Sequence, residues 1–340
     1  CGAGVAYLLA QEVKSQKSKV KSYGDGHLEL VALATIADLV PLKGANRTLV
    51  RLGLENLRRT KRVGLLELFR EAAINPGNIG VYEIGHIIAP RLNAMGRLEY
   101  AMDSLRLLCT KNKERAQILA QTLGSTNRQR QELTIETVEH AKKNLKSQIS
   151  NLKSTSVNLK SLLFIAHESY QQGVIGLVAG KLVEEFYKPA IVVSVGEKFS
   201  KASARSINGF NIIEFIRSSS ELLIDAGGHP MAAGFTVETS KLSILQKMLE
   251  DKAHKLLDEE KLTRSLRIDC ELDLFLINNN LYNEIQKLAP FGMGNPEPTF
   301  VSRSVVIESL RAVGNGNKHL KLLVHQSDLN KTPLDRHSGE

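Results

Sequence analysis

A strand–helix–strand pattern between residues 162 and 195 constrains the fold more than any other part of the sequence. Residues 162–166 form a short apolar run, residues 174–186 have helical spacing, and residues 190–195 form a second apolar run. Two buried strands that are joined through a helix run parallel, with the helix as the crossover connection. The sequence therefore predicts an α/β domain in this region.

A glycine–histidine segment follows, which reads D-A-G-G-H-P-M-A-A-G-F-T-V over residues 225–237. Gly227 and Gly228 allow backbone conformations that other residues avoid, and they directly precede His229. Small residues on both sides of a histidine are typical of a loop that holds a phosphate or the end of a nucleotide. A tight turn packed against a helix explains the same residues equally well.

A polar strand is predicted at residues 201–207, between the α/β unit and the glycine–histidine segment. Alternate residues of a strand face the same side, so the hydroxyl of Ser203 and the guanidinium of Arg205 converge there. Together they could bind one ligand oxygen, or they could belong to an exposed strand face.

Two arginines enclose small residues in the sequence R-L-N-A-M-G-R over residues 91–97. Guanidinium groups bind phosphate through paired hydrogen bonds, which makes this segment a candidate phosphate site. A surface loop with structural salt bridges is the alternative. His167, at the end of a strand before the turn at 173–176, is a further candidate beside a helix N-terminus, and a purely structural βα turn explains it at least as well.

Asp38 lies near the end of a continuous apolar run, residues 28–40, which predicts a strand buried on both faces. A carboxylate in such a run needs a partner. A divalent metal and a cap on the following turn are equally suitable partners. A helix is expected to begin at Asn46.

One long helix is predicted over residues 110–148, and its polar middle suits a helix that bridges two domains. The sequence Asn-Leu-Lys-Ser then occurs at 144–147, 151–154 and 158–161, which indicates a solvated linker. An antiparallel strand over 266–274, a helix over 281–288 and strands over 300–313 and 319–324 complete the chain. They predict a small, incomplete β-barrel.

The composition narrows the classes of function. A formal net charge of +9 over 340 residues favours a polyanionic partner such as nucleic acid. No apolar run approaches the roughly 20 residues of a membrane span, so no membrane partner is expected. The three cysteines are far apart in sequence, as in a cytosolic protein with reduced thiols.

Taken in order, six motifs resemble the DHH/DHHA1 phosphoesterase family, and within it the RecJ exonucleases specific for single-stranded DNA. They are A-T-I-A-D-L-V-P-L (34–42), R-L-N-A-M-G-R (91–97), G-V-I-G-L-V-A-G-K-L (173–182), S-A-R-S (203–206), G-G-H-P-M-A-A-G (227–234) and L-A-P-F-G-M-G-N-P-E-P (288–298). The resemblance implies an α/β protein with four parts. These are the remainder of a parallel-sheet DHH domain (1–108), a connecting helix and linker (109–160), a DHHA1 domain (161–262) and a partial OB-like β-barrel (263–340).

The resemblance also implies a reaction, the hydrolysis of single-stranded DNA from its 5′ end by two Mn²⁺ or Mg²⁺ ions, in DNA repair and recombination. Asp38 would be a catalytic metal ligand. The implied partners are a single-strand-binding protein and a RecQ-type helicase, and the protein would be a cytoplasmic monomer. The residues that would bind the substrate are Arg91, Asn93, Arg97, Ser203, Arg205, Ser206, Gly227, Gly228 and His229.

The sequence departs from the family in its metal ligands, because it contains neither Asp-x-Asp nor Asp-His-His. We therefore expect most ligands to lie upstream of Cys1, and we expect this chain to be inactive alone. Residues 328–340 also depart from the family. Two alternatives remain, a DHH/DHHA1 phosphodiesterase acting on oligonucleotides or cyclic dinucleotides, and a non-catalytic protein that binds single-stranded nucleic acid.

Overall fold

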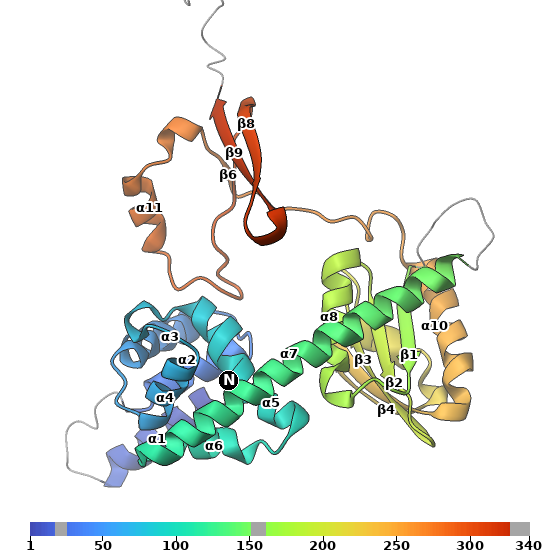
Figure 1. Cartoon of the computed structure of the whole chain (residues 1–340), viewed down its shortest axis with the longest axis horizontal. Coiled ribbons are helices and arrows are strands. Elements are labelled where there is room, and N and C mark those ends of the chain that lie inside the picture. Colours follow the sequence, from blue (N-terminus) through green and yellow to red (C-terminus); the bar gives the residue numbers. More distant parts are fainter. Residues whose placement is uncertain (18–25, 151–160, 327–340) are drawn as a thin grey trace, which may run out of the picture. The chain divides into compact units, whose positions relative to one another are not determined.

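The computed structural model describes residues 1–17, 26–150 and 161–326 (Figure 1). They form two compact units. The first contains Cys1–Arg59, Ile79–Ile84 and Leu266–Glu340, and the second contains Thr60–Asn78 and Gly85–Ser265. The second Asn-Leu-Lys-Ser copy and most of the third lie outside the described residues.

The first unit begins with three helices, α1 (Gly2–Lys17), α2 (Leu28–Ala37) and α3 (Gly44–Arg58). The strand predicted over residues 28–40 is therefore wrong. An unbroken apolar run fits a buried strand and a buried helix alike, and leucine and alanine favour the helix. The start predicted at Asn46 is also wrong, since α3 begins at Gly44. The described residues before 163 contain helices and turns but no strand, so the parallel sheet expected within 1–108 is not among them.

Helices α2 and α3 pack closely because Gly53 has no side chain. A Cβ atom at this position would lie 2.6 Å from the Cβ of Ala32 and would overlap the carbonyl oxygen of Leu28. Val50 and Leu57 extend the buried face of α3 on either side of the glycine. This close approach fixes the packing of α2 against α3.

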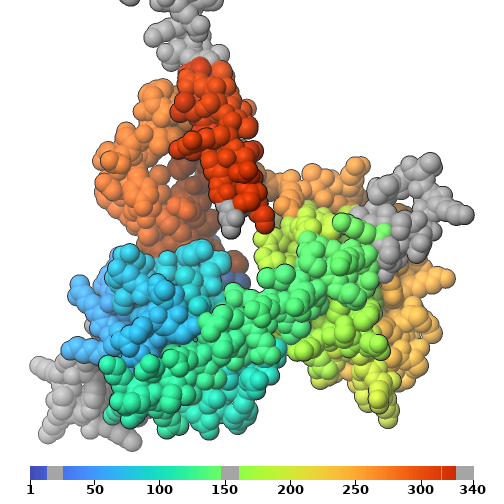
Figure 2. All heavy atoms as spheres, viewed as in Figure 1, coloured from blue at the N-terminus to red at the C-terminus, as the bar shows by residue number. Residues whose placement is uncertain are grey.

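The C-terminal part of the first unit contains α11 (Asn279–Gln286) and two small sheets. Strand β6 (Cys270–Glu271) pairs in parallel with β7 (Phe300–Val301), so the antiparallel strand predicted over 266–274 is wrong in length and direction. Strands β8 (Val305–Val313) and β9 (His319–Gln326) form the predicted hairpin. The side chains of the hairpin are open to solvent (Figure 2). The described strands of this part thus form two separate two-stranded sheets, and the partial β-barrel stays a prediction.

The second unit contains four helices before its sheet, α4 (Val63–Glu71), α5 (Ala89–Leu98), α6 (Met102–Cys109) and α7 (Lys113–Ser150). The predicted long helix is confirmed as α7, which continues without a break through Gly124. Its contacts are with α4, α5 and α6 and also with α8 (Gln172–Phe186) and strand β1 (Leu163–His167). Helix α7 thus joins the helical part of this unit to its sheet.

A five-stranded sheet follows, in the order β1-β2-β3-β5-β4 (Figure 1). Its other strands are β2 (Ala190–Ser194), β3 (Phe199–Arg205), β4 (Leu223–His229) and β5 (Ala232–Glu238). The predicted parallel pair with a helical crossover is confirmed, since β1 and β2 run parallel on either side of α8 in sequence. The remaining pairs are antiparallel.

Helices cover both faces of this sheet. Side chains of β1 and β2 on one face pack with α8 and with Ala141 and Leu145 of α7. The opposite face packs with α9 (Ile212–Arg217) and α10 (Leu242–Leu256). Helix α8 contacts β2 and β3 extensively, whereas β5 and β4 continue the sheet beyond them.

The glycine–histidine segment is a strand pair, not the loop that the sequence predicted. Residues up to His229 belong to β4, and the chain turns at Pro230 and Met231 into β5. Gly228 has a φ of +147°, and a Cβ atom there would lie 2.5 Å from the Cα of Ala233. Glycine at position 228 therefore allows β4 and β5 to lie close together. Residue propensities do not predict this strand, because glycine is depleted in strands.

None of the helices in the described ranges is both long enough and apolar enough to span a bilayer.

Candidate functional site

Ser203 and Arg205 lie on one face of strand β3, as their alternate spacing predicts. The intervening Ala204 faces the other side, where it is buried in the core beneath α9 and α10. On the neighbouring strand β5, Ser203 is paired with Gly234 and Arg205 is paired with Ala232. The hydroxyl and the guanidinium therefore stand beside positions that carry little or no side chain.

Strand β4 extends the same surface. His229 is opposite Ala232, and Gly227 is opposite Gly234. A row of residues, Arg205, Ala232 and His229, thus crosses three adjacent strands. Since neighbouring strands are about 4.8 Å apart, the Cα atoms of Arg205 and His229 are about 10 Å apart. The region between them is a low floor of glycine and alanine.

Helix α8 closes one side of this floor at Gly176. A Cβ atom on Gly176 would lie 2.9 Å from both the Nη2 atom of Arg205 and the Oγ atom of Ser203. Arg205 also donates hydrogen bonds from Nη1 to Ser203 Oγ at 3.2 Å and to the carbonyl of Ala204 at 2.8 Å. The helix backbone and these bonds together fix the orientation of the guanidinium.

Arg97, at the end of α5, approaches the same place. It donates a hydrogen bond from Nη1 to the carbonyl of Gly173 at 3.3 Å, and its own carbonyl would overlap a Cβ atom on that glycine. Burial lowers the pKa of Arg205, and the positive charge of Arg97 lowers it further. The two cations are thus close enough to repel each other.

Arg130 of α7 adds a third cation, which the sequence analysis missed. Burial lowers its pKa, and the charge of Arg97 lowers it further. Its Nη2 atom donates to Oδ1 of Asn127 at 2.9 Å, while its Nε atom is buried and has no hydrogen-bond partner. The available signal is the pair Asn127 and Arg130 at i and i+3, in the polar middle that was interpreted only as typical of a helix bridging two domains.

Arg97, Arg130 and Arg205 are called the arginine cluster below. Within the described parts of the chain, none of the three forms an ion pair with a carboxylate. Cations that repel each other and are partly desolvated are costly unless an anion joins them. Guanidinium groups bind phosphate oxygens with good geometry, so the cluster is suited to a phosphate-bearing ligand.

Arg91 is placed differently from the other arginines of its motif. Its Nε atom donates to Glu71 Oε2 at 2.8 Å, and Nη1 donates to the carbonyl of Ile87 at 3.0 Å. Glu71 in turn accepts from Arg128 of α7 at 2.9 Å. These bonds tie α4, α5 and α7 together, and the structure therefore gives Arg91 a stabilising role. Its predicted contact with substrate stays a prediction.

Two further predicted residues lie close to the site in sequence. Ser206 is buried, and its hydroxyl donates to the carbonyl of Phe210 at 2.5 Å, which holds the turn after β3. Asn93 is exposed on α5, one turn before Arg97. The structure thus brings Ser203, Arg205 and Arg97 together, while Ser206 supports the chain behind them.

Asp38 is exposed and caps the C-terminal end of α2. The prediction that Asp38 lies at the end of a buried strand is therefore wrong. Among the described residues, no group of three or more His, Cys, Asp or Glu side chains could hold a metal ion. The residues described here do not fit a two-metal centre, and no catalytic step is derived from them.

His167, which the sequence analysis singled out, lies at the end of β1 in a small ring cluster. Its ring centroid is 4.6 Å from that of His140 on α7 and 5.4 Å from that of Tyr170. The Nδ1 atom of His140 is 3.0 Å from the hydroxyl of Tyr170, and burial raises the pKa of this tyrosine. The cluster joins α7 to the β1–α8 turn, which is a structural role.

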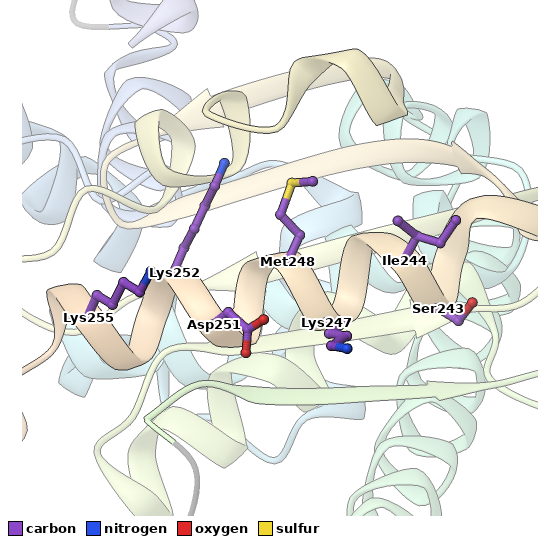
Figure 3. A pocket seen from close by; sticks show the side chains of 7 residues that line it. All are labelled: Ser243, Ile244, Lys247, Met248, Asp251, Lys252 and Lys255. Atoms are coloured by element: carbon purple, nitrogen blue, oxygen red, sulfur yellow. The ribbon is translucent and has the colours of Figure 1, made fainter.

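A hollow of about 600 Å³ lies along α10. All of its lining residues come from this one helix, and Ile244, Met248 and Lys252 point to the same side (Figure 3). The ammonium group of Lys252 is already bound to the carbonyl of Ser218 at 2.6 Å and to Ser219 Oγ at 2.9 Å. No second element converges on this hollow, so it is not assigned as a site.

Comparison with known proteins agrees with this arrangement. Residues 156–255 match the model of the DHHA1 domain, and residues 268–334 match the model of the RecJ OB domain. The single-stranded-DNA-specific exonuclease RecJ of Bacillus subtilis is 35% identical over 100% of this chain and 42% of its own length. The exonuclease of that name from Thermus thermophilus is 32% identical over 94% of this chain and 44% of its own length.

Solved structures give the same result. The crystal structure of RecJ with Mg²⁺ from Thermus thermophilus matches with a TM-score of 0.73 and 29% identity, over 90% of this chain and 47% of that one. A structure of exonuclease RecJ bound to manganese matches with a TM-score of 0.54 and 30% identity, over 68% of this chain and 56% of that one. The chain spans about half the length of these relatives. With its DHHA1 and RecJ OB domains, the chain belongs to the RecJ family.

Proposed function

We propose that this chain is the part of a RecJ-type exonuclease that binds the 5′ end of single-stranded DNA. The observation that carries the proposal is the arginine cluster. Arg205 lies beside the hydroxyl of Ser203, the charge of Arg97 lowers the pKa of both Arg205 and Arg130, and none of the three has a carboxylate partner in the described parts of the chain. The relatives named as exonucleases specific for single-stranded DNA support this choice of polymer.

The geometry favours a terminal phosphate over an internal one. A phosphate monoester has three free oxygens and carries more negative charge than a diester, so it can satisfy several guanidinium groups at once. Arg205 is already oriented by Ser203 and by the backbone of α8 at Gly176, which reduces the entropy lost on binding. Gly227 and Gly234 leave room on the floor beside it for the terminal sugar, and His229 stands at the far edge.

The remaining parts of the family's activity are also proposals for this protein. We propose Mn²⁺ or Mg²⁺ as the cofactor of the whole protein, with Asp38 as one ligand and the other ligands outside the described residues. The relatives whose structures contain Mg²⁺ or manganese support the ion class. We also propose four parts, a DHH domain remainder (1–108), a connecting helix and linker (109–160), a DHHA1 domain (161–262) and a partial OB-like domain (263–340). A single-strand-binding protein and a RecQ-type helicase are proposed as partners of a cytoplasmic monomer.

Binding measurements with and without a 5′ phosphate test the proposal directly. A single-stranded oligonucleotide labelled at its 3′ end would be titrated with the protein and its variants, with fluorescence anisotropy as the readout. Arg205→Ala should lower the affinity for the phosphorylated strand by about 1.5–3 kcal/mol, which corresponds to roughly 10- to 150-fold. The strand without the phosphate should lose much less.

Arg217→Ala is the matched control, because this arginine is exposed at the end of α9 on the opposite side of the sheet. It removes the same charge and should leave the affinity unchanged. The proposal fails if Arg205→Ala and Arg217→Ala weaken binding equally, or if the 5′ phosphate makes no difference to the unaltered protein.

A further inference from the structure

A cavity of about 530 Å³ in the first unit shares no residue with the arginine cluster. Helix α3 forms one wall, residues 80–81 form another, and residues 286–291 close it. Its volume lies within the range of small-molecule sites. The residues that matter for its chemistry are Arg51, Glu55, Arg58, Lys287, Phe291 and Val81.

The wall formed by residues 286–291 is fixed by specific bonds. Leu42 donates its amide to the carbonyl of Met293 at 2.7 Å, and Arg47 donates to the carbonyls of Leu288 and Ala289. From the turn that follows, Asn295 donates from Nδ2 to the carbonyl of Leu288 at 3.0 Å. The cavity therefore forms because residues 286–291 are held beside α3 by these bonds.

Gly292 makes the docking possible, since a Cβ atom on it would lie 2.8 Å from the Cδ1 of Leu42. Backbone bonds pair Gly292 with Asn295 in both directions, at 2.8 and 3.0 Å. The glycine in the turn after α11 thus lets the chain lie close to Leu42. The turn brings Phe291 beside α3 while its backbone lies against Leu42.

The charges at the cavity favour an anion. Arg51 and Arg58 contribute two positive charges against one negative charge from Glu55, while Lys287 is paired with Glu284, its Nζ atom donating to Oε1 at 2.6 Å. Within the described residues Arg51 forms no hydrogen bond or ion pair, and Arg58 uses its Nε atom to donate to the carbonyl of Ile79 at 2.8 Å. The terminal nitrogens of both arginines are therefore available to a phosphate.

The apolar part of the cavity suits a nucleobase. Phe291 is half-buried and presents an aromatic ring, and Leu54, Val81 and Pro290 add apolar surface beside it. Stacking of a base on an aromatic side chain is tolerant of sequence and commonly accompanies cationic contacts to the phosphate. An arginine pair and a phenylalanine at one cavity therefore match the two ends of a nucleotide.

We propose that this cavity binds one nucleoside monophosphate unit, with its phosphate on Arg51 and Arg58 and its base against Phe291. The unit comes either from within a single strand or from a free 5′-mononucleotide. The proposal does not depend on the arginine cluster, because the two places share no residue and belong to different compact units.

Titration calorimetry with deoxyadenosine monophosphate tests this, in the Arg205→Ala background so that the arginine cluster is weakened. In this background the nucleotide should still bind, and adding Arg51→Glu should reduce the affinity at least tenfold. Adding Arg59→Glu is the matched control, because Arg59 is also exposed but does not line the cavity. Deoxyadenosine without phosphate should bind much more weakly.

Single-stranded d(A)8 distinguishes the two sources. If Arg51→Glu also weakens binding of this strand, the cavity holds a nucleotide within a polymer, and if it does not, the cavity holds the free mononucleotide. Phe291→Leu keeps an apolar side chain but removes the aromatic ring, and it should weaken nucleotide binding without changing the circular dichroism spectrum. Loss of all nucleotide binding in Arg205→Ala alone, or equal effects of Arg51→Glu and Arg59→Glu, would overturn the proposal.

Discussion

Gly176 and Arg205 are so close that a Cβ atom on the glycine would stand 2.9 Å from the Nη2 atom of the arginine. The hydroxyl of Ser203 lies at the same distance from that point. The orientation of both polar groups therefore depends on the bare backbone of α8. A glycine in the middle of a helix costs about 0.5–1 kcal/mol of stability relative to alanine, and here it leaves space for the proposed phosphate contact.

Gly176→Ala should weaken DNA binding without lowering the stability of the protein. The methyl group would push aside the ends of two flexible side chains, so the affinity for a 5′-phosphorylated single strand should fall about tenfold, by roughly 1.4 kcal/mol. The free energy of unfolding should stay the same or rise by up to about 1 kcal/mol, because alanine favours the helix. Urea unfolding and fluorescence anisotropy measure the two quantities.

Gly180→Ala is the control for this substitution, since a Cβ atom on Gly180 would meet nothing within 4 Å. It changes the same helix by the same methyl group and should leave the affinity unaltered. Equal affinity of the two variants would show that Arg205 and Ser203 do not contact the strand.

Glu71→Ala should destabilise the second unit. The carboxylate of Glu71 joins Arg91 at 2.8 Å and Arg128 at 2.9 Å, and the side chains of Glu71 and Arg91 are 10% and 16% exposed. Removing one partner of a largely buried pair leaves a desolvated cation, which costs roughly 3–5 kcal/mol for a fully buried pair and about 2 kcal/mol here. Chemical denaturation measures the loss. Glu132→Gln, an exposed change on α7, should stay within about 0.5 kcal/mol of the unaltered protein.

Gly124→Ala should act through the same carboxylate. A Cβ atom on Gly124 would overlap Glu71, so the carboxylate must leave both arginines, although alanine is otherwise the better helix former. The substitution should destabilise the protein by about 1–3 kcal/mol. In the Glu71→Ala background the same change should cost little, because the overlapping group is gone. Additive losses in this double-mutant cycle would mean that Gly124 is needed for another reason.

Phosphate should stabilise the protein through the arginine cluster. Burial lowers the pKa of Arg130 and Arg205, so folding disfavours their charged forms. This cost is fully present below their folded pKa values and disappears only as the pH rises through the ordinary pKa of arginine. Between pH 5 and 9 both arginines remain charged and the cost is constant. A bound anion offsets it by about 1.4 kcal/mol at ten times its Kd.

Thermal unfolding at constant ionic strength measures this effect, with phosphate replacing chloride. The rise in Tm should be larger at pH 8 than at pH 5.5, because phosphate gains its second charge near pH 6 to 7 while the arginines do not titrate. Arg205→Ala should remove most of the rise and Arg217→Ala should preserve it. A rise that is identical in both variants would place the anion elsewhere.

Local sequence patterns predicted the strand–helix–strand unit, the long helix and the alternate placement of Ser203 and Arg205, because each depends on neighbours in the chain. They failed where the outcome depends on distant contacts. The apolar run at 28–40 fits a strand and a helix alike, and the close contact with α3 at Gly53 stabilises the helix that its leucine and alanine residues favour. The glycine–histidine segment is a strand because β5 pairs with it. Arg130 joins the site through tertiary packing of α7, which spacing within the helix could not indicate.

Metal removal should leave both the fold and the binding of this chain unchanged. Asp38 is exposed at the end of α2, and the described residues contain no group of three potential ligands that could hold a cation. EDTA should therefore alter neither the Tm nor the affinity for a 5′-phosphorylated strand. The chain alone should also release no nucleotides from that strand when Mn²⁺ is added, as measured on a denaturing gel beside a full-length RecJ relative. Digestion that requires Mn²⁺ and is abolished by Asp38→Ala would contradict this prediction, and it would show that Asp38 acts with ligands outside the described residues.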